Sequence, residues 1–351
     1  MTTAVSTAPL RLSLAGGGTD LPEYYRHGPT NVTAVALDRF VHVAVADTPE
    51  QALRAVPAAV HRVSPAEAER HPYVRAARAM LGLDGPSHVA VASQVLPGSG
   101  LGGSGAFTVA LLDALARFAG RAPGARESAA RAFRLERELL GRSVGQQDQW
   151  IAALGGAARL DFSPDGTVDA ASDPELFDTV AELLAGGGLV LARTGEERDA
   201  ADVLGKARPI TREDHRSAVE AARTMDRAYR SGNPRLIGAA LRAHWSAKIR
   251  RNPAADHAAC RRVQEATGTA VHGLKVVGAG GGGHLLLAVE PTERRRTLDV
   301  LTGLGLTPLP VRAWPRGLQQ GLPARAHTGR DPLGGGTAER ERGEAPACGW
   351  G

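Results

Sequence analysis

The stretch Pro97-Gly98-Ser99-Gly100-Leu101-Gly102-Gly103-Ser104-Gly105-Ala106 carries five glycines in eight residues. It lies between an apolar segment at 89–95, which predicts a strand, and small and apolar residues at 106–119, which predict a helix. Where side chains are missing, backbone N–H groups can turn toward an anion, and the positive end of the following helix strengthens that attraction. We therefore predict that residues 97–105 bind phosphate, with a flexible surface loop as the alternative.

Three other glycine motifs could explain this loop, and the residues disfavour each. A P-loop ends in Gly-Lys-Ser/Thr, and no lysine lies here. The glycines match the G-x-G-x-x-G of dinucleotide-binding proteins, but residues 118–124 form no second strand ending in an acid. Ser104 nearly completes the hydrolase motif G-x-S-x-G, yet it stands well beyond the strand rather than at a sharp elbow. A dinucleotide-dependent oxidoreductase stays as the less favoured alternative.

The composition excludes several classes of protein. The chain has 351 residues, 43% hydrophobic and 23% charged, which suits a large core in two domains and argues against wholesale disorder. Its 42 basic residues are nearly balanced by 37 acidic ones, without a basic and aromatic patch, so we expect no nucleic-acid partner. No apolar run approaches the ~20 residues of a membrane helix, and the start lacks a secretory pattern. We expect no membrane partner and a cytoplasmic location. The two cysteines, Cys260 and Cys348, cannot form a disulfide framework.

Strand and helix patterns alternate along most of the chain. They predict strands at 10–14, 41–45, 89–95, 189–191 and 284–289, and helices at 66–82, 106–119, 126–140, 146–155, 213–230 and 234–249. Further glycine runs stand at 16–18, 186–188 and 278–283. From about residue 317 the chain turns to Gly, Pro, Arg and Glu without apolar periodicity, so we expect a disordered tail at 317–351.

Two acidic residues lie on apolar faces of predicted helices. The neighbours of Glu136 at three and four positions along the helix are all apolar: Ala132, Phe133, Leu139 and Leu140. A lone charge there is expensive, so Glu136 is either paired with a buried arginine or bound to a metal ion. Asp148 also has apolar helical neighbours and stands between two glutamines. It is either a helix cap or a functional carboxylate.

Three glycine-bearing motifs stand in order along the chain, at 9–22, 97–106 and 276–283. Their order and spacing resemble those of the GHMP small-molecule kinases, named for galactokinase, homoserine kinase, mevalonate kinase and phosphomevalonate kinase. The middle loop is similar to the P-x-G-x-G-L-G-S-S-A phosphate loop of that superfamily. The resemblance covers about residues 8–315. It implies a two-domain α+β fold with the active-site cleft between an N-terminal GHMP kinase domain at 1–185, which carries the phosphate loop, and a C-terminal one at 186–316.

Within the superfamily the chain looks most like the D-glycero-D-manno-heptose 7-phosphate kinases. The stretches that carry this likeness are Ala15–Tyr25, Gly145–Trp150 and Gly278–Gly283. The resemblance implies ATP- and Mg²⁺-dependent phosphorylation of a sugar hydroxyl, namely the anomeric one of the heptose 7-phosphate, giving a 1,7-bisphosphate. Fucose-type and galactose-type kinases of the same superfamily stay open as alternatives. The oligomeric state has no signal in the sequence.

The same resemblance implies a role for each residue of the site. Ser104 and Glu136 match the Mg²⁺ ligands, and residues 97–105 match the segment that binds the ATP phosphates. Asp148 matches the proposed base, which takes the proton of the attacking hydroxyl or only orients it, and Arg11 would keep that carboxylate ionised. The residues expected to meet the sugar are Gly17, Gly18, Thr19, Asp20, Asp148, Gly280 and Gly281.

The chain departs from the family pattern at several positions. Gly103 replaces the first serine of the usual pair, so we expect weaker nucleotide binding rather than none. Gln146 stands where family members have lysine, and residues 28–31 differ from the usual glycine-rich turn. Candidates for holding a remote phosphate of the substrate are Lys248, Arg250 and Arg251, with a solvated run of charges as the alternative. We expect structural roles for two lone histidines, His272 and His284.

Overall fold

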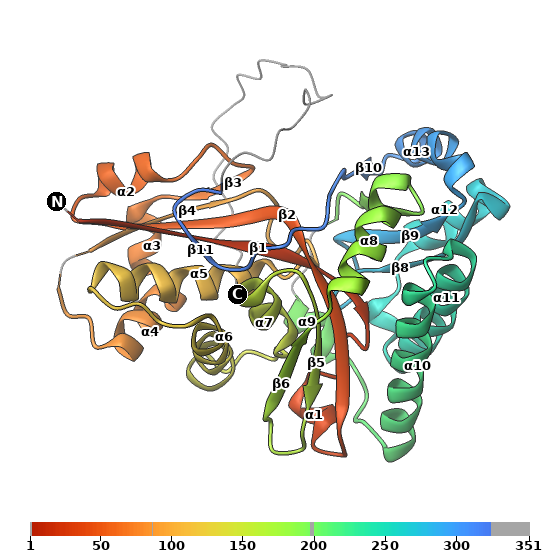
Figure 1. Ribbon diagram of the computed structural model, residues 1–351, viewed down its shortest axis with the longest axis horizontal. Coiled ribbons are helices and arrows are strands. Elements are labelled where there is room, and N and C mark those ends of the chain that lie inside the picture. Colours follow the sequence, from red (N-terminus) through yellow and green to blue (C-terminus); the bar gives the residue numbers. More distant parts are fainter. Residues whose placement is uncertain (1, 86, 197–199, 324–351) are drawn as a thin grey trace.

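The strands form two antiparallel sheets in the computed structural model, which describes residues 2–85, 87–196 and 200–323 (Figure 1). The first sheet has the order β11-β1-β2-β4-β3, and β5 pairs with both β2 and β6. The second has the order β10-β7-β9-β8. The strands of the first sheet are β1 (Thr3–Ala15), β2 (Thr30–Ala46), β3 (His61–Val63), β4 (His88–Ser93), β5 (Ala157–Phe162), β6 (Val168–Ser172) and β11 (Gln319–Gln320). Those of the second are β7 (Leu189–Arg193), β8 (Val271–Val276), β9 (His284–Val289) and β10 (Thr307–Pro308).

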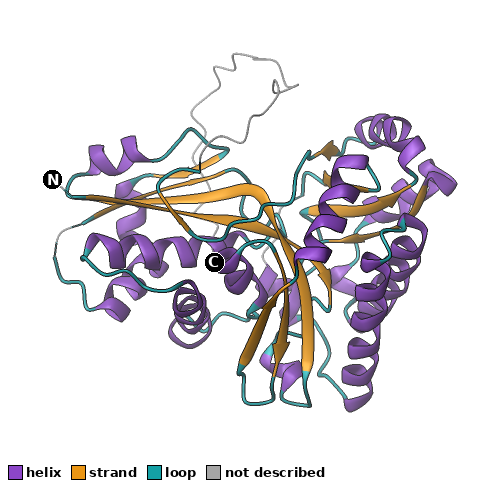
Figure 2. Cartoon of the chain, in the orientation of Figure 1, coloured by secondary structure: helices purple, strands orange, loops and turns teal. Residues whose placement is uncertain are grey.

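Helices cover both sheets, in keeping with the predicted α+β class (Figure 2). Between the strands of the first sheet lie α1 (Pro22–Tyr25), α2 (Pro49–Ala55), α3 (Pro65–Arg70), α4 (Pro72–Leu81), α5 (Gly103–Phe118), α6 (Ala125–Arg134), the π-helical turn η1 (Leu135–Leu139) and α7 (Gln147–Leu154). The later helices are α8 (Pro174–Gly186), α9 (Ala200–Gly205), α10 (Arg212–Arg230), α11 (Pro234–Arg251), α12 (Ala258–Thr267) and α13 (Arg294–Gly303), with the 3₁₀ turns η2 (Pro253–Ala255), η3 (Gly268–Ala270) and η4 (Pro291–Glu293).

The long antiparallel pair β1–β2, called the β1–β2 hairpin below, lies at the centre of the first sheet and bends near its middle. β4 pairs along one arm of β2 and β5 along the other (Figure 1). The register shifts between Pro9 and Leu10, which leaves Asp38 and Arg39 of β2 without partners in β1. Extra residues of this kind bend a strand and increase its twist. The hairpin can therefore contact the layer of α5 and α7 as well as α10 of the second half.

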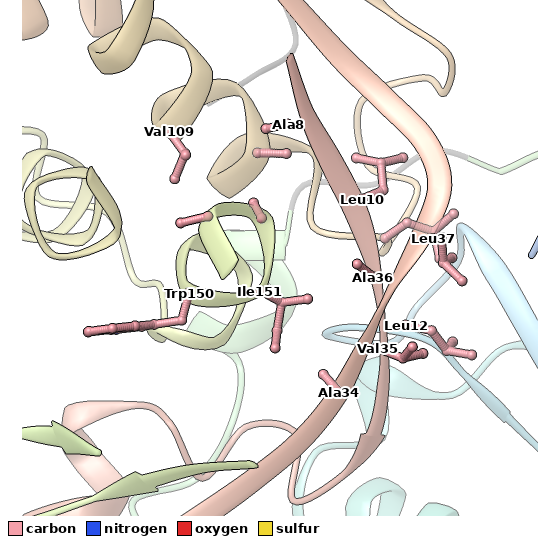
Figure 3. Packing of buried hydrophobic residues seen from close by; sticks show 14 of the residues in the cluster. Ala8, Leu10, Leu12, Ala34, Val35, Ala36, Leu37, Val109, Trp150 and Ile151 are labelled. Carbon is pink, nitrogen blue, oxygen red and sulfur yellow. The ribbon is translucent and has the colours of Figure 1, made fainter. Parts of the chain in front are cut away.

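One hydrophobic core joins the hairpin to the helices on both of its sides. Figure 3 shows residues of this core, with Val109, Trp150 and Ile151 on one side of the hairpin and Leu12 and Leu37 on the other. Buried side chains of α10 and α11 belong to the same cluster, as do residues of β7 and β9. The two sheets consequently share apolar contacts at their junction, where the cleft described below opens.

The expected disordered tail is wrong for residues 317–323. β11 pairs with β1 in antiparallel register, Ser6 with Gln320 and Thr7 with Gln319, and the Leu318 N–H donates to the Ala153 carbonyl at 3.1 Å. A strand of two residues is too short to show apolar periodicity in the sequence. Its backbone nevertheless forms hydrogen bonds with the edge of the sheet. The remainder of the predicted tail, 324–351, lies outside the described residues.

Two predicted helices differ from the structure for identifiable reasons. The helix expected at 66–82 is broken at His71, because Pro72 has no N–H to continue it and starts α4 instead. The helix expected at 126–140 is α6 followed by the π-helical turn η1. The predicted domain boundary between 185 and 186 falls at the end of α8 and stays a prediction.

Every strand pairing that the described residues make is antiparallel. The glycine loop after β4 is therefore not part of a parallel βαβ unit, which a dinucleotide-binding fold requires. This arrangement removes the structural basis for the oxidoreductase alternative. Across the described ranges, none of the helices combines the length and the apolar character needed to cross a bilayer.

Candidate active site

The glycine loop leads from β4 directly into the N-terminus of α5. Gly98, Gly100 and Gly102 have φ of 73°, 78° and 78°, a left-handed conformation that glycine adopts without a steric penalty. Gly102 is the N-cap of α5, and no side chain caps this helix. The first N–H groups of α5 are thus left without a side-chain partner at the positive end of a helix of 16 residues, which is the arrangement that binds anions.

The second glycine loop packs against the first. A Cβ on Gly278 would lie 2.9 Å from the Gly100 carbonyl oxygen, and one on Gly283 would lie 2.6 Å from that of Ser99. The ring Nδ1 of His284 lies 2.8 Å from the same Ser99 oxygen and donates to it. Burial lowers the pKa of His284, so the ring is neutral and its role is structural, as predicted. The third motif therefore supports the phosphate loop from the opposite side.

A cavity of about 980 Å³ lies beside the loop. Its walls include these predicted loop residues: Pro97, Gly98, Ser99, Gly100, Gly102, Gly103 and Ser104. Leu101 is fully buried, and Gly105 packs against Asp148, so neither of them lines the cavity. Gly280 and Gly281 also differ from the expectation. Both contact Ala255, while Gly278 and Ala279 line the cavity in their place.

Asp148 and Arg11 form an ion pair at the floor of the cavity. Arg11 Nε donates to Asp148 Oδ1 at 2.7 Å, and Arg11 Nη1 donates to the Gly100 carbonyl at 2.6 Å. Arg11 is buried, whereas the Asp148 side chain keeps 27% of its surface exposed toward the cavity. The Asp148 carboxylate accepts from the side chains of Arg11 and Gln147, and no backbone N–H of α7 is among its donors in the described residues, so the helix-cap alternative finds no support. One guanidinium thus joins the phosphate loop to the predicted catalytic carboxylate.

Glu136 lies in the π-helical turn η1 and is fully buried. Its carboxylate accepts hydrogen bonds from the Tyr73 hydroxyl at 3.3 Å and from the Gln149 amide. Among the residues that the structure describes, Glu136 forms no ion pair, so the buried-arginine alternative also finds no support. Burial raises the pKa of the Glu136 carboxyl to about 7, and the negative charge of Asp148 adds to the shift. π-helical turns are frequent at functional sites.

Ser104 and Glu136 together fit a magnesium ion. The Ser104 hydroxyl is a hydrogen-bonding partner of the Glu136 carboxylate, which opposes the rise of that carboxyl's pKa. The described residues contain no group of three or more His, Cys, Asp or Glu that could hold a metal ion. Mg²⁺ prefers oxygen ligands and is commonly held by one or two protein groups together with phosphate oxygens and water. A buried carboxylate without a cationic partner, next to a hydroxyl and a phosphate loop, is the donor set such an ion requires.

The glycine turn at 16–18 lies at the cavity wall, and the residues predicted to meet the sugar there, Gly17, Gly18, Thr19 and Asp20, line it. Asp20 accepts from the Gly18 N–H at 3.1 Å and from the Gln147 N–H at 3.0 Å. Its carboxylate therefore ties the turn to the start of α7, and burial raises its pKa. The Thr19 hydroxyl instead donates to the Gly16 carbonyl at 2.8 Å, inside the turn.

Sequence reasoning missed several residues of the cavity wall. Tyr24, Arg142, Arg208 and His244 line the cavity, together with the predicted Lys248, Arg250 and Arg251. Helical spacing in the sequence could have found part of this set, because residues 244, 247, 248 and 251 are three or four positions apart and so lie on one face of α11. Gln146, which stands where family members have lysine, lies outside the cavity wall. Its amide donates to the Gly166 carbonyl at 3.2 Å.

A comparison with protein families finds one match in this region. The GHMP kinases N-terminal domain matches residues 71–156, which include the glycine loop, Glu136 and Asp148. Over this segment the chain is similar to the GHMP kinases. The residues that sequence and geometry single out around the loop therefore lie inside the segment that is similar to this domain.

Two curated relatives and one solved structure are also similar to this chain. Mevalonate kinase of Methanothermobacter thermautotrophicus is 34% identical over 138 residues, which are 36% of this chain and only 42% of the relative. D-glycero-alpha-D-manno-heptose 7-phosphate kinase of Campylobacter jejuni is 25% identical over 329 residues, 86% of this chain and 94% of the relative. The crystal structure of a D-glycero-D-manno-heptose 1-phosphate kinase from Bacteroides thetaiotaomicron superposes with a TM-score of 0.67 at 20% identity, covering 92% of this chain and all of that one.

These likenesses confirm the predicted superfamily and the predicted fold class. At 20% identity the structural similarity establishes the fold of the GHMP kinases over most of the chain and no finer property. The N-terminal domain establishes the reaction class, which is phosphoryl transfer by a kinase.

Proposed function

We propose that the protein is an ATP- and Mg²⁺-dependent sugar kinase that phosphorylates the anomeric hydroxyl of D-glycero-D-manno-heptose 7-phosphate. The single observation that carries the proposal is the Arg11–Asp148 pair, held against the uncapped phosphate loop at the floor of one cavity. The named heptose kinase of C. jejuni, which aligns along 86% of the chain, supports the choice of sugar.

The glycine loop would hold the β- and γ-phosphates of ATP. The uncapped start of α5, which carries the positive end of the helix dipole, lies at the cavity wall, and the glycines there have no side chain to separate it from an anion. The resulting fixed donors match the demand of phosphoryl transfer, which needs alignment and charge neutralisation more than covalent chemistry.

Ser104 and Glu136 would hold Mg²⁺ behind the loop. Bound there, the ion would supply positive charge next to the phosphate oxygens of the nucleotide. The partners of the Glu136 carboxylate, Tyr73 and Gln149, are neutral, and a buried carboxylate with only neutral partners destabilises a folded protein. A bound cation would offset that cost, which favours the metal-binding role.

Asp148 would act on the sugar hydroxyl. In the transfer the hydroxyl oxygen forms a bond with the γ-phosphorus, the bond from that phosphorus to the β–γ bridging oxygen breaks, and ADP leaves. The hydroxyl proton passes to an Asp148 carboxylate oxygen, which must come within ~3 Å of the hydroxyl. Arg11 contacts both Asp148 and the carbonyl of Gly100, so its guanidinium also lies where negative charge develops.

The wall formed by α10 and α11 favours an anionic sugar. Arg208 is neutralised by two hydrogen bonds of 2.7 Å to Asp214, but Arg250 and Arg251 have no acidic partner among the described residues. The Arg251 guanidinium lies over the ring of Tyr24, 5.3 Å from its centroid, which holds it at the cavity wall. A phosphate on the far end of the sugar would find its counter-charges here.

The test is an ADP-release assay over free sugars and sugar phosphates, followed by phosphorus NMR of each product. We expect turnover with D-glycero-D-manno-heptose 7-phosphate and a second phosphorus signal from an anomeric phosphate. Turnover of free fucose or galactose with none on the heptose phosphate would leave a sugar kinase but remove this substrate. Absence of ADP release with every sugar, under conditions where the protein binds ATP, would remove the proposal.

A further inference from the structure

Lys275 is a buried lysine that the proposed mechanism does not use. It lies in β8, the last strand in the order of the second sheet, and is 5% exposed. Its ammonium group donates to the backbone carbonyls of Ser13 at 2.9 Å and Leu14 at 3.2 Å, which belong to β1 of the first sheet. No acidic residue pairs with it in the described part of the chain. The side chain therefore crosses from one sheet to a backbone segment of the other.

The two carbonyls mark a bulge in β1. The register with β2 passes from Ser13, opposite Ala34, to Ala15, opposite Thr33, so that Leu14 has no partner in β2. A bulge of this kind re-aims the strand and leaves its extra residue outside the ladder. Here the strand ends at Ala15 and leads into the glycine turn that lines the sugar end of the cavity. Lys275 supplies hydrogen-bond donors at the point where the chain leaves the sheet.

The bulge is also connected to Asp148 through hydrogen bonds. The Ser13 hydroxyl donates to Gln147 Oε1 at 2.8 Å, and the Gln147 amide donates to Asp148 Oδ1 at 3.3 Å. Arg11 lies two residues before Ser13 on the same strand and also donates to Asp148, through their ion pair. A shift of β1 at residues 13–14 would thus move the glycine turn and the supports of Asp148 together.

The surroundings of Lys275 are cationic rather than acidic. Burial, and then the positive charge of Arg11, lowers its pKa to about 7. His244, which lines the cavity from α11, feels the charges of both Lys275 and Lys248, and its pKa lies well below the ordinary value mainly because of burial. A buried ammonium without a counter-ion is expensive, and two carbonyl acceptors offset only part of that cost. Retaining it requires a function that an apolar side chain cannot supply.

We propose that Lys275 is a positioning residue of the reaction, which clamps the bulge of β1 and so fixes the glycine turn at 16–18 in the geometry that binds the sugar. This inference rests on the proposed function. The clamp acts most directly on the glycine turn, because its two hydrogen bonds end at residues 13 and 14, next to that turn, whereas the phosphate loop contacts β1 further back, at Arg11. Sugar binding and nucleotide binding are therefore expected to respond differently to its removal.

The test compares Lys275→Met, which keeps the length of the side chain and removes its donors, with Lys206→Met. Lys206 is exposed and lies outside the cavity wall, so its variant controls for the loss of one lysine. For Lys275→Met we expect a KM for the sugar about tenfold higher or more, and a KM for ATP within about twofold of the wild type. A merely structural lysine would change both constants together, and that result, or no change in either, overturns the proposal.

Hydrogen exchange at the amides of residues 15–20 separates this inference from the proposed function. We expect these amides to exchange faster in Lys275→Met than in Lys206→Met, whether or not the substrate has been identified. Unchanged exchange overturns the clamp even if the enzyme phosphorylates the heptose. Faster exchange in a protein that phosphorylates no sugar supports the clamp on the turn while the proposed function fails.

Should Lys275→Met fail to fold, the wild-type protein still gives an answer. The chain has only three lysines, so an NMR spectrum with labelled lysine side chains is simple to read. The Lys275 signal is identified by its titration near pH 7. We expect it to shift when the sugar substrate binds and to respond much less to ATP alone. A signal that is indifferent to the sugar overturns the proposal.

Discussion

At the scale of single residues, the site depends on two acids with opposite environments. Asp148 is partly exposed, paired with an arginine and open to the cavity, whereas Glu136 is buried among neutral groups. Two carboxylates in such different settings can carry different tasks at the same pH. The exposed acid is suited to meet a substrate hydroxyl and the buried acid to meet a cation.

Replacing Asp148 with asparagine tests the first of these tasks. The amide keeps the size of the side chain but cannot accept a proton, so turnover is expected to fall at least ~10²-fold while ATP binding stays near its wild-type value. Steady-state kinetics and an ATP titration measure both quantities. Asp165→Asn is the matched control, because Asp165 is exposed in the β5–β6 hairpin and outside the cavity wall. Near-normal turnover in Asp148→Asn would leave the residue only an orienting role.

Replacing Glu136 with glutamine tests the second task. The folded pKa of about 7 lies above the ordinary 4.5, so the folded protein binds more protons than the unfolded one between these values, and this group lowers stability as pH rises through them. At pH 8 without Mg²⁺ we therefore expect Glu136→Gln to be more stable by about 1–3 kcal/mol in urea unfolding. With Mg²⁺ and ATP, turnover should fall at least ~10²-fold.

The neighbouring Glu138 provides the control for that substitution. It lies in the same π-helical turn, but it is exposed and paired with Arg134. Glu138→Gln is expected to change neither stability nor turnover measurably. If Glu136→Gln kept full Mg²⁺-dependent turnover, the assignment of Glu136 as a metal ligand would be lost.

At the scale of elements, the approach of α5 to α7 decides whether Asp148 meets the loop. A Cβ on Gly105 would lie 2.6 Å from the Cβ of Asp148 and 3.1 Å from the Gln149 nitrogen. Gly105→Ala must push the two helices apart, and we expect a loss of about 1–3 kcal/mol in thermal or urea unfolding together with reduced turnover. Gly186→Ala in α8, where a Cβ meets nothing within 4 Å, should be neutral or slightly stabilising. Equal effects of both variants would contradict this account of the helix contact.

Local patterns explain how far the sequence predicts these elements and the site. The loop, Glu136 and Asp148 were predictable because glycine spacing and helix-face neighbours are local properties. The break at His71, the pairing of β11 and the packing of Gly280 against Ala255 depend on distant partners that periodicity does not show. The same holds for Arg208, which precedes α10, and for His244 of α11, because both line the cavity far along the chain from the glycine loop.

At the scale of the whole molecule, the junction of the two sheets is bonded through a lysine that is only weakly basic. The folded pKa of Lys275 is about 7, below the ordinary 10.5, so between these values the unfolded chain binds more protons than the folded one. By linkage, this group makes the free energy of unfolding rise with pH across that window, and the stability it contributes is lost as pH falls toward 7. The junction is therefore expected to be stronger in mild alkali than at neutral pH.

The difference between two unfolding curves isolates this contribution from every other titrating group. From pH 7 to pH 9 the free energy of unfolding of the wild type should rise relative to that of Lys275→Met by about 2 kcal/mol, because one buried ammonium loses its proton in the wild type alone. Lys206→Met should follow the wild type in parallel over the same range, since Lys206 is exposed. A difference in the free energy of unfolding between wild type and Lys275→Met that stays constant from pH 7 to pH 9 would contradict this expectation. It would mean that the pKa of Lys275 is close to its ordinary value, so that the side chain stays charged throughout this range.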